Sequence, residues 1–447
     1  MDSIKQYEAK KAAIVEQFAH VRASKETAKL VKDTSNLFRH NEQPKATLDV
    51  RSLNAVISVD VEKRILDVEG MTTYETIVTA TLPFGLIPAV VPELKTITVG
   101  GVYAGIGVET TSGKYGFMHE TVLEAEILTG DGEVLVCSEK KNADLFFGFP
   151  NTYGTLGYAL RLKLQLFPCK PFVKLTRTTY PAAALFVEAL SEAGKQTRAK
   201  SDIAFVEGTV LAKAQYVVTL GTYVNTAHHT RNIYKKPFYQ TIGTETEDYL
   251  TTYDYLFRYD PDWFWCSQYL GMENPFIRAL IPKRKMRSDV YYKIARATGK
   301  LPVMKFLRKY VWRREPLIQD VEVPYEKTLE FIEWFDKEIG MTPYIVAPVQ
   351  QYRSVIYPLS PISPGKQFLN IGFYAPHKTR MPDLYYTKRI DQKVLSMHVR
   401  KMLYSVTTLS EEEFWTLFPQ NTYQSLKKKY DPQGTFKTLY EKITQIK

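Results

Sequence analysis

Residues 95–116 constrain the fold of this 447-residue chain most, because glycine, threonine and serine are too frequent there for a long helix or strand. Gly100, Gly101, Gly105 and Gly107 follow one another closely. Glycine lets backbone N–H groups approach an anion, and hydroxyl side chains add donors, so such a loop can hold a diphosphate without a lysine. An ordinary turn is the alternative interpretation of the glycine cluster taken alone.

Two common nucleotide-binding motifs do not fit this segment. A Rossmann fingerprint needs a small residue that opens a helix after the glycines. Residues 110–113 read Thr-Thr-Ser-Gly instead, and we expect a loop there, with no helix beginning. A P-loop needs Ser or Thr after its Gly-Lys pair, whereas Lys114 is followed by Tyr115. The segment therefore predicts a different kind of nucleotide loop.

Short strands and helices surround this loop. A capping box formed by Thr72 and Glu75 predicts the start of a helix that ends near Leu82. Four leucines alternate with polar residues between Leu160 and Leu166, which predicts a half-buried strand. We expect further strands at Leu48–Val50, Ala55–Val61, Ile65–Glu69, Val122–Leu128 and Val134–Cys137, and a helix at Ala143–Phe147.

The chain continues beyond Pro168 and Pro171 with longer elements, and its length exceeds what one hydrophobic core usually supports. Alternating strands and helices there predict an α+β domain with its own sheet. We expect helices at Ala182–Lys195 and Tyr325–Ile339, strands at Ile203–Val210, Tyr216–Tyr223, Tyr344–Val349 and Phe368–Tyr374, and a helical tail over Glu411–Lys447.

The N-terminus and the cysteines indicate a cytoplasmic protein. Residues 1–22 form an amphipathic pattern with no apolar leader region, and no run of apolar residues is long enough to span a membrane. Cys137, Cys169 and Cys266 are scattered, fit reduced thiols and have no zinc-like spacing, so no metal is expected.

The net charge of +11 comes from one segment. Thirteen Lys or Arg lie between Arg278 and Arg314 against one acid, Asp289, so this segment carries +12 and the rest of the chain −1. Aromatic and aliphatic residues interleave with the charges. Peripheral docking on an anionic membrane is one interpretation, and a solvated helical face with buried aromatics is the other. Nothing resembles a nucleic-acid recognition motif, so no nucleic-acid partner is expected.

Four motifs in a fixed order identify the first half. They are "PELKTITVGG" (92–101), "SGKYGFMHETV" (112–122), "EILTGDGEV" (126–134) and "DLFFGFPNTYGTLG" (144–157), preceded by "KDTSNLF" (32–38). This series resembles the two-lobed PCMH-type FAD-binding domain of the vanillyl-alcohol-oxidase-like oxidoreductases. The resemblance implies an α+β protein with an FAD domain at residues 1–170, a substrate (cap) domain at 171–395, and a C-terminal segment at 396–447 that packs back on the FAD domain.

The resemblance also implies which residues contact FAD. We see no His or Cys at the family's usual flavin-linking positions, so we expect the FAD to be non-covalent. The implied contacts are Thr34, Ser35, Asn36, Leu37, Thr98, Val99, Gly100, Gly101, Gly105, Ile106, Gly107, Val108, Ser112, Gly113, Lys114, Tyr115, Gly116, Glu120, Val122, Gly154, Thr155, Leu156, Gly157 and Tyr158.

Motifs along most of the chain narrow the family. "GTLGYALRLKLQLFPCKPFVKL" (154–175), "VEVPYEKTLEFIEWF" (321–335) and "FLNIGFYAP" (368–376) look like the Δ24-sterol reductases, and "RSDVYYKI" (287–294) looks like bacterial methylene-fatty-acyl reductases. These relatives imply reduction of an isolated C=C bond in a lipid, a sterol or a fatty-acyl chain, with NADPH as electron donor. An alcohol or hydroxy-acid oxidase of the same fold and a non-catalytic flavin-binding protein are the alternatives.

Such a reaction needs a proton donor, because an isolated alkene has no carbonyl to take up negative charge. We select Tyr404, Tyr115 and His119 as candidate catalytic residues, and Glu109 and Glu120 as further candidate acids. The tyrosines could instead only pack on the flavin, and His119 could be a satisfied loop histidine. Thr407 stands where oxidase-type relatives commonly have a lysine, which argues against the oxidase alternative.

Overall fold

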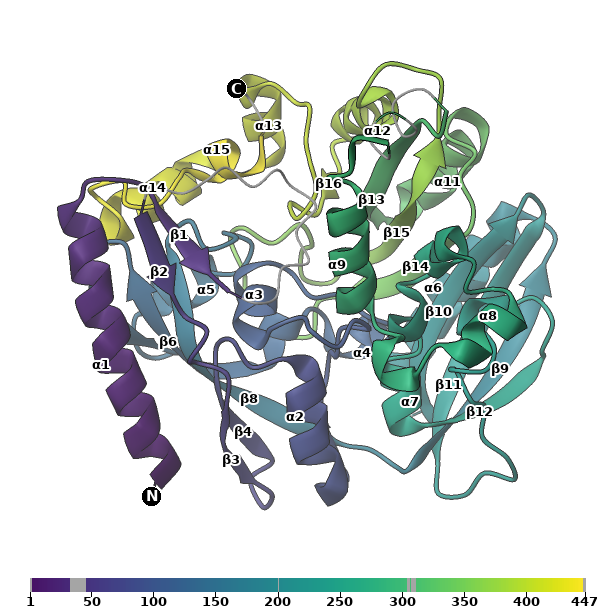
Figure 1. Ribbon diagram of the computed structural model, residues 1–447, viewed down its shortest axis with the longest axis horizontal. Helices are drawn as coiled ribbons and strands as arrows, with labels where there is room; N and C mark the ends of the chain where they lie inside the picture. The colour runs from purple at the N-terminus through teal and green to yellow at the C-terminus, as the bar shows by residue number, and fades with distance from the viewer. Residues whose placement is uncertain (1, 33–45, 200, 304–305, 307–310, 445–447) are drawn as a thin grey trace.

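The computed structural model describes residues 2–32, 46–199, 201–303, 306 and 311–444. Within these residues the chain forms two antiparallel sheets, each with helices packed against it, and a small parallel pair of strands (Figure 1). β8 ends at Pro168 in the first sheet and β9 begins at Phe172 in the second. The predicted α+β class is confirmed.

The first sheet has the strand order β3-β4-β8-β6-β7, with β5 paired to β8. The leucines of β8 are buried at alternate positions, and α3 packs against this strand. Its strands are β3 (Val56–Asp60), β4 (Ile65–Glu69), β5 (Leu86–Pro88), β6 (Val122–Thr129), β7 (Val134–Cys137) and β8 (Gly157–Pro168). The parallel pair is β1 (Ala28–Val31) and β2 (Ala46–Asp49).

The helices of the first half are short except for the N-terminal one. α1 (Asp2–Ala23) lies along the sheet, where Tyr7 donates a hydrogen bond to Glu126 at 2.9 Å and Phe18 is buried. The others are α2 (Tyr74–Thr81), η1 (Leu82–Phe84), α3 (Val99–Ala104), α4 (Ser112–Tyr115), η2 (Met118–Thr121) and α5 (Ala143–Gly148).

The second sheet runs β12-β9-β11-β10-β14-β15-β13-β16. α6 (Ala183–Arg198) and α11 (Tyr325–Glu338) pack on one of its faces, where the rings of Phe335 and Phe373 lie 4.8 Å apart. Its strands are β9 (Phe172–Tyr180), β10 (Ile203–Ala212), β11 (Gln215–Val224), β12 (Glu247–Thr251), β13 (Arg314–Pro324), β14 (Tyr344–Gln350), β15 (Gln367–Lys378) and β16 (Arg400–Lys401).

A series of short helices between β11 and β13 covers the other face of this sheet at β15. Phe264, within this stretch, stacks on Tyr374 with ring centroids 4.1 Å apart. The helices are η3 (Phe238–Thr241), α7 (Thr252–Leu256), η4 (Asp260–Asp262), η5 (Cys266–Leu270), α8 (Pro275–Leu280), η6 (Lys283–Lys285) and α9 (Ser288–Thr298). None of the described helices is long and apolar enough to cross a bilayer.

The C-terminal helices return to the first sheet (Figure 1). The Lys427 ammonium donates to the carbonyl of Thr155 at 2.8 Å, and Tyr430 donates to Asp144 at 2.8 Å. These helices are α13 (Glu411–Leu417), α14 (Gln420–Tyr430) and α15 (Leu439–Ile443). The helix before them, α12 (Tyr385–Ser396), packs against β13 and β16 of the second sheet instead.

Most expected elements are confirmed within one to four residues, two local predictions are wrong, and one strand was missed. Among the described residues the expected helical tail is three separate helices, α13, α14 and α15. The helix after β4 is capped by Thr73, whose side chain accepts from the N–H of Thr76, so Thr72 is not the cap. Short helices α3 and α4 occupy the glycine segment where no helix was expected. Because both are brief and the sheet is antiparallel, they do not restore a Rossmann interpretation. β13 was not expected at all.

The basic segment is neither fully solvated nor uniform. Arg278 is buried and its guanidinium pairs with Asp262 at 2.6 Å. Arg287 pairs with Glu75 at 2.8 Å. The alternative with buried aromatics holds for Tyr291, whereas Trp312 is 51% exposed, so that interpretation is wrong for part of the segment.

Candidate functional site

The amides of Val99 and Gly100 anchor the glycine segment to the chain that follows β4. The N–H of Val99 donates to the carbonyl of Thr72 at 3.0 Å, and that of Gly100 donates to Gly70 at 2.8 Å. A Cβ at position 100 would lie 2.6 Å from the Gly70 carbonyl oxygen, so only glycine allows this approach. The start of the predicted diphosphate loop is thus a fixed part of the fold.

Several backbone amides farther along the segment are free to bind a ligand. Among the described residues no acceptor receives a backbone N–H from Gly101, Ile106, Gly107 or Val108. Backbone donors without partners are rare in folded proteins unless a ligand or water binds them. Donors of this kind, without side chains at positions 101 and 107 to block approach, suit an anion or a polar ring edge.

A second loop lies against this one. The N–H of Asn151 donates to the carbonyl of Gly105 at 3.0 Å, and that of Tyr153 donates to Ala104 at 2.7 Å. The Tyr153 hydroxyl then accepts the N–H of Leu403 at 2.8 Å. These bonds bring the C-terminal segment that contains Tyr404 to the glycine loop.

Tyr404 therefore lies beside two predicted cofactor residues. It packs in one apolar cluster with Ile106, Val108, Phe117 and Met402. Tyr404 is half-buried, and we call the region where it meets the glycine loop and Asp320 the Tyr404 site. Its hydroxyl donates to the carboxylate of Asp320, and burial raises the pKa of Tyr404 well above its usual value.

Asp320 is the centre of the polar groups at the Tyr404 site. It lies on β13, is 5% exposed, and accepts a second hydrogen bond from the Tyr374 hydroxyl at 2.5 Å. Burial raises the pKa of Asp320 to about 6, and the two tyrosine hydroxyls limit the rise by stabilising the carboxylate. Gly372, opposite on β15, leaves the space, because a Cβ there would lie 2.4 Å from the Asp320 carboxylate.

The same face of the second sheet carries another carboxyl group. Glu322 lies two residues along β13 and accepts a hydrogen bond from Asn370 at 2.8 Å. It is 1% exposed, and burial followed by the charge of Asp320 raises its pKa to about 8. The alternating residues Val321 and Val323 face α11 instead. β13 is therefore buried on both faces, and both acids lie on the face that meets Tyr404.

A buried ion cluster adjoins these acids. Arg258 donates to Glu93 at 2.6 Å and to Glu207, which also accepts the Tyr259 hydroxyl at 2.7 Å. Burial raises the pKa of Glu93, and Arg258 opposes that effect. Glu109, a predicted candidate acid, accepts the N–H of Glu93 at 3.2 Å, and burial raises its pKa well above the usual range. Glu109 also lines a narrow internal pocket beside Arg258.

His119 is not joined to this group. It is 1% exposed, neither ring nitrogen has a hydrogen-bond partner among the described residues, and its ring lies 4.4 Å from that of Tyr357. Burial lowers the pKa of His119 to about 3, so the imidazole is neutral. A neutral imidazole packed between aromatic rings is a poor proton donor. The structure does not support His119 as the acid.

Glu120 has a local structural role. Its carboxylate accepts the backbone N–H groups of Phe117 at 2.9 Å, Tyr352 at 2.7 Å and Arg353 at 2.9 Å. Burial nevertheless raises the pKa of Glu120 to about 7. Gly116 has φ +68°, and a Cβ there would lie 2.0 Å from the Glu120 carboxylate. Glu120 thus ties η2 to the chain that follows β14.

Tyr115 and its neighbours also face protein. The Tyr115 ring lies 4.4 Å from Phe167, and no described contact joins it to Asp320. The Ser112 hydroxyl accepts the N–H of Glu109 at 2.9 Å. Gly113 packs toward Pro348, Val122 is fully buried in β6, and the Lys114 ammonium lies over the Tyr115 ring.

The loop at residues 154–158 is covered by the C-terminal helices. Tyr423 donates to the Thr155 hydroxyl at 2.9 Å, and the Tyr158 ring packs on Phe436. Gly154 has φ +73°, Leu156 is fully buried, and Gly157 lies against the Leu128 carbonyl. The predicted contacts Thr34, Ser35, Asn36 and Leu37 lie outside the described residues.

Comparisons with known proteins indicate the kind of protein. An FAD-binding-domain family model matches residues 11–138. The Delta(24)-sterol reductase of Homo sapiens is 26% identical over 413 residues, covering 88% of this chain and 76% of the relative. That of Pisum sativum is 27% identical over 436 residues with the same coverage. Cytokinin dehydrogenase 1 of Arabidopsis thaliana is 35% identical over 121 residues, or 27% of this chain and 21% of the relative.

The chain is an FAD-binding oxidoreductase related to the Δ(24)-sterol reductases. The residues that fit the cofactor best are those with available amides, Gly101 and 106–108, together with the apolar cluster around Tyr404. Asp320, Tyr374 and Glu322 belong to the Tyr404 site, and the sequence analysis did not identify them. The only sequence signal for the two acids was their alternation with valines, a pattern that also fits a solvent-exposed face.

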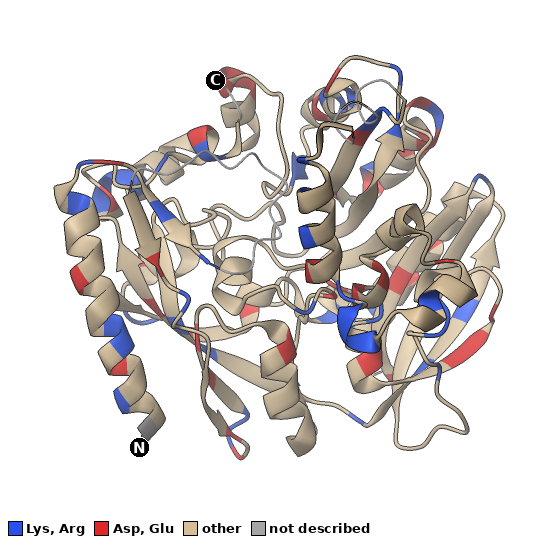
Figure 2. Cartoon of the chain, in the orientation of Figure 1, with Lys and Arg blue, Asp and Glu red and all other residues tan. Residues whose placement is uncertain are grey.

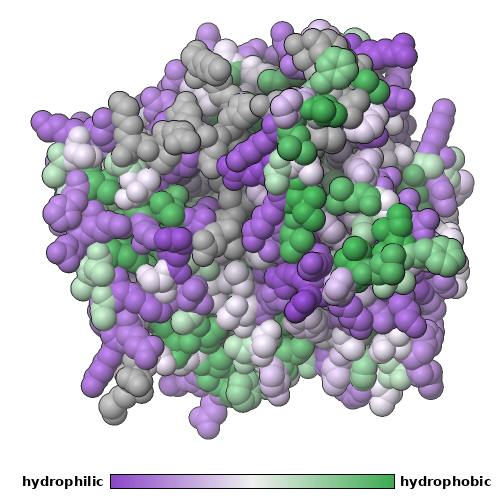
Figure 3. Space-filling model, in the orientation of Figure 1, coloured by the Kyte–Doolittle hydropathy of each residue, from purple (hydrophilic) through white to green (hydrophobic). Residues whose placement is uncertain are grey.

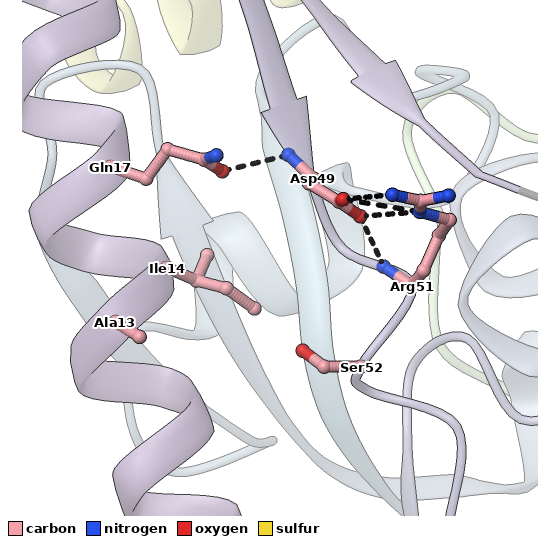
Figure 4. A pocket seen from close by; sticks show the side chains of 6 residues that line it. All are labelled: Ala13, Ile14, Gln17, Asp49, Arg51 and Ser52. Carbon is pink, nitrogen blue, oxygen red and sulfur yellow. Dashed lines mark hydrogen bonds and ion pairs between the residues drawn. The ribbon is translucent and has the colours of Figure 1, made fainter.

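A separate surface pocket lies in the first half of the chain, between α1 and β2. Between α1 and the end of β2 (Figure 4), the Gln17 side chain accepts the N–H of Asp49, whose carboxylate pairs with Arg51. Because these polar groups satisfy one another, we assign no cofactor to it. The pocket is lined by Ala13, Ile14, Gln17, Asp49, Arg51 and Ser52.

Proposed function

We propose that this FAD-binding oxidoreductase reduces an isolated carbon–carbon double bond of a lipid. The observation that carries the proposal is the Tyr404–Asp320–Tyr374 group, a buried carboxyl of raised pKa beside the available amides of the glycine loop. Bound reduced FAD would supply the hydride. The protein must then supply a proton, a positioned substrate and a site without bulk water.

Asp320 and Tyr404 suit the delivery of that proton. When Asp320 is protonated, its hydroxyl can donate to the Tyr404 oxygen, which frees the Tyr404 hydrogen for a bound substrate. The proton then passes from the Tyr404 oxygen to one alkene carbon, and the Asp320 proton replaces it. Glu322, with a pKa near 8, holds a further proton on the same sheet face.

An isolated alkene that accepts a proton develops positive charge on its other carbon. The buried carboxylate of Asp320 and the tyrosine rings of the Tyr404 site would stabilise that charge. Substrates that form a tertiary centre are therefore favoured, which includes a branched sterol side chain and a methylene-substituted fatty-acyl chain. The apolar cluster around Tyr404 suits such a chain. We propose NADPH as the electron donor on the strength of the sterol-reductase relatives.

Position 407 does not favour the oxidase alternative. The Thr407 hydroxyl donates to Asp391 at 3.2 Å, and the same carboxylate pairs with Lys401. Lys401 also donates to the carbonyl of Val406 at 2.7 Å. The partners of its ammonium group are therefore Asp391 and Val406, outside the apolar cluster around Tyr404.

Lipid mass spectrometry of cells with and without the protein tests the proposal. We expect a two-hydrogen mass gain in a sterol or in a branched acyl chain, lost in the Asp320→Asn variant. Asp336→Asn is a matched control, because Asp336 also accepts two tyrosine hydroxyls, those of Tyr216 at 2.9 Å and Tyr344 at 2.8 Å, outside the Tyr404 site. No mass gain in any lipid class, with FAD bound and reducible by NADPH, would refute lipid reduction.

A further inference from the structure

α8 exposes apolar side chains in a way that packing within the chain does not explain. Phe276 is 80% exposed and Leu280 82% exposed, and they lie four residues apart on one helical face with Ile277 beside them. Tyr269 and Leu270 at the end of η5 are each 43% exposed. A Cβ on Gly271, the residue after Leu270, would lie 3.2 Å from Ile277, so η5 and α8 are adjacent.

The helix has its polar side inward. Arg278 is 1% exposed, pairs with Asp262 at 2.6 Å and donates to the carbonyl of Ile233 at 2.9 Å. A helix on a soluble surface normally buries its apolar stripe and exposes its charges. α8 has the opposite arrangement. Its buried arginine fixes the helix in place, so Phe276 and Leu280 point outward.

Basic side chains continue this surface. Lys283, Arg284 and Lys285 of η6 follow α8 directly and are exposed, whereas Arg287 is engaged with Glu75. Figure 2 shows the cluster of basic residues beside α8, and Figure 3 shows hydrophobic side chains gathered over α8 next to hydrophilic ones. We call Tyr269, Leu270, Phe276, Ile277, Leu280, Lys283, Arg284 and Lys285 the α8 surface.

Acidic groups do not cancel this charge. From residue 269 to residue 303 the sequence has two acids, Glu273 and Asp289. Glu273 accepts hydrogen bonds from Tyr239 and Gln240, and Asp289 pairs with Arg287 at 3.0 Å. Lys293, Arg296 and Lys300 on and after α9 add exposed positive charge.

We propose that the α8 surface docks on an anionic lipid bilayer. Phe276 and Leu280 would enter the boundary between headgroups and acyl chains, and the three basic residues of η6 would contact anionic headgroups. Charge complementarity with an acidic lipid surface and outward apolar side chains are both needed for this mode. A nucleic acid would use the basic residues and leave the apolar ones without a role.

The α8 surface is only a few residues away, in the sequence, from residues that contact Tyr374. Phe264 stacks on Tyr374, and Cys266 donates to the Tyr374 carbonyl at 3.3 Å, four residues before Leu270. A lipid that leaves the bilayer at the α8 surface would therefore start close to Tyr374 and the Tyr404 site. This last step rests on the proposed function, whereas docking itself does not.

Vesicle flotation of the FAD-loaded full chain tests the docking. The vesicles contain equal parts phosphatidylcholine and phosphatidylglycerol, with pure phosphatidylcholine for comparison. We expect binding to the anionic vesicles only, weakened by salt. Lys283→Glu, Arg284→Glu and Lys285→Glu together should weaken it roughly hundredfold. Phe276→Ser with Leu280→Ser should weaken it at least roughly tenfold.

Matched variants separate this surface from general effects. Lys140→Glu, Lys141→Glu and Lys428→Glu change the net charge equally at exposed positions of the first half and of α14. Phe84→Ser with Leu185→Ser removes the same residue types at positions 54% and 48% exposed. Both controls should bind like the wild type. Equal loss in surface and control variants, or nucleic-acid binding that only the charge variant abolishes with no flotation, would overturn the proposal. Flotation requires no turnover, so it fails independently of the proposed reaction.

Discussion

Asp320→Asn should remove activity and increase the free energy of unfolding at the same time. Burial raises the pKa of Asp320 from 3.8 to about 6 in the folded protein. The folded state therefore binds this proton more tightly than the unfolded state does. Its contribution to stability is complete below the unfolded pKa and is lost as the pH rises through about 6.

The size of the effect follows from the same values. At roughly 1.4 kcal/mol per pH unit, ionised Asp320 costs the folded protein up to about 3 kcal/mol at pH 8. Asparagine has nearly the same shape and cannot ionise, and it can still bond to Tyr374 and Tyr404 through its oxygen and its amide. We expect a gain of about 1–3 kcal/mol at pH 8 and little change at pH 4.

Urea unfolding at the two pH values, in a constant excess of FAD, measures this difference. Turnover should fall by roughly 10²–10⁴ because the proton donor is lost. The wild-type rate should also decline as the pH rises above about 6. A variant that is less stable than wild type at pH 8, or a stability difference that does not change with pH, would show that Asp320 is ionised and stabilising, and would refute the assignment.

Three other changes test the site and its support. Arg258→Met should cost about 3–5 kcal/mol in urea unfolding, because two buried carboxylates lose their partner, and a cost below ~1 kcal/mol would contradict the buried network. Gly101→Glu should lower FAD retention, measured by visible absorbance, with unchanged circular dichroism, since it adds a negative charge beside the available amides; full retention would count against the diphosphate loop. Gly116→Ala should lower the unfolding free energy by more than ~2 kcal/mol, from its positive φ and the contact with Glu120, and a neutral result would contradict that geometry.

The sequence alone determined the FAD-binding half of this protein. Glycine clusters, turn residues and alternating leucines depend on local backbone geometry, so their order along the chain can be read without a structure. The alternation in β8 and the hairpins on either side were predicted correctly for that reason. Tyr404 was identified by its resemblance to a family position, without its partner.

Only the tertiary structure showed that Asp320 and Glu322 are buried acids at the Tyr404 site. Alternation shows which side chains of β13 share a face, but it cannot show whether a second layer covers that face. The short helices before β13, the glycine loop and the C-terminal segment do so, and they turn Asp320 and Glu322 into buried acids of raised pKa. The same reason applies to Arg278, which a charge count treats like its exposed neighbours until Asp262 is found beside it.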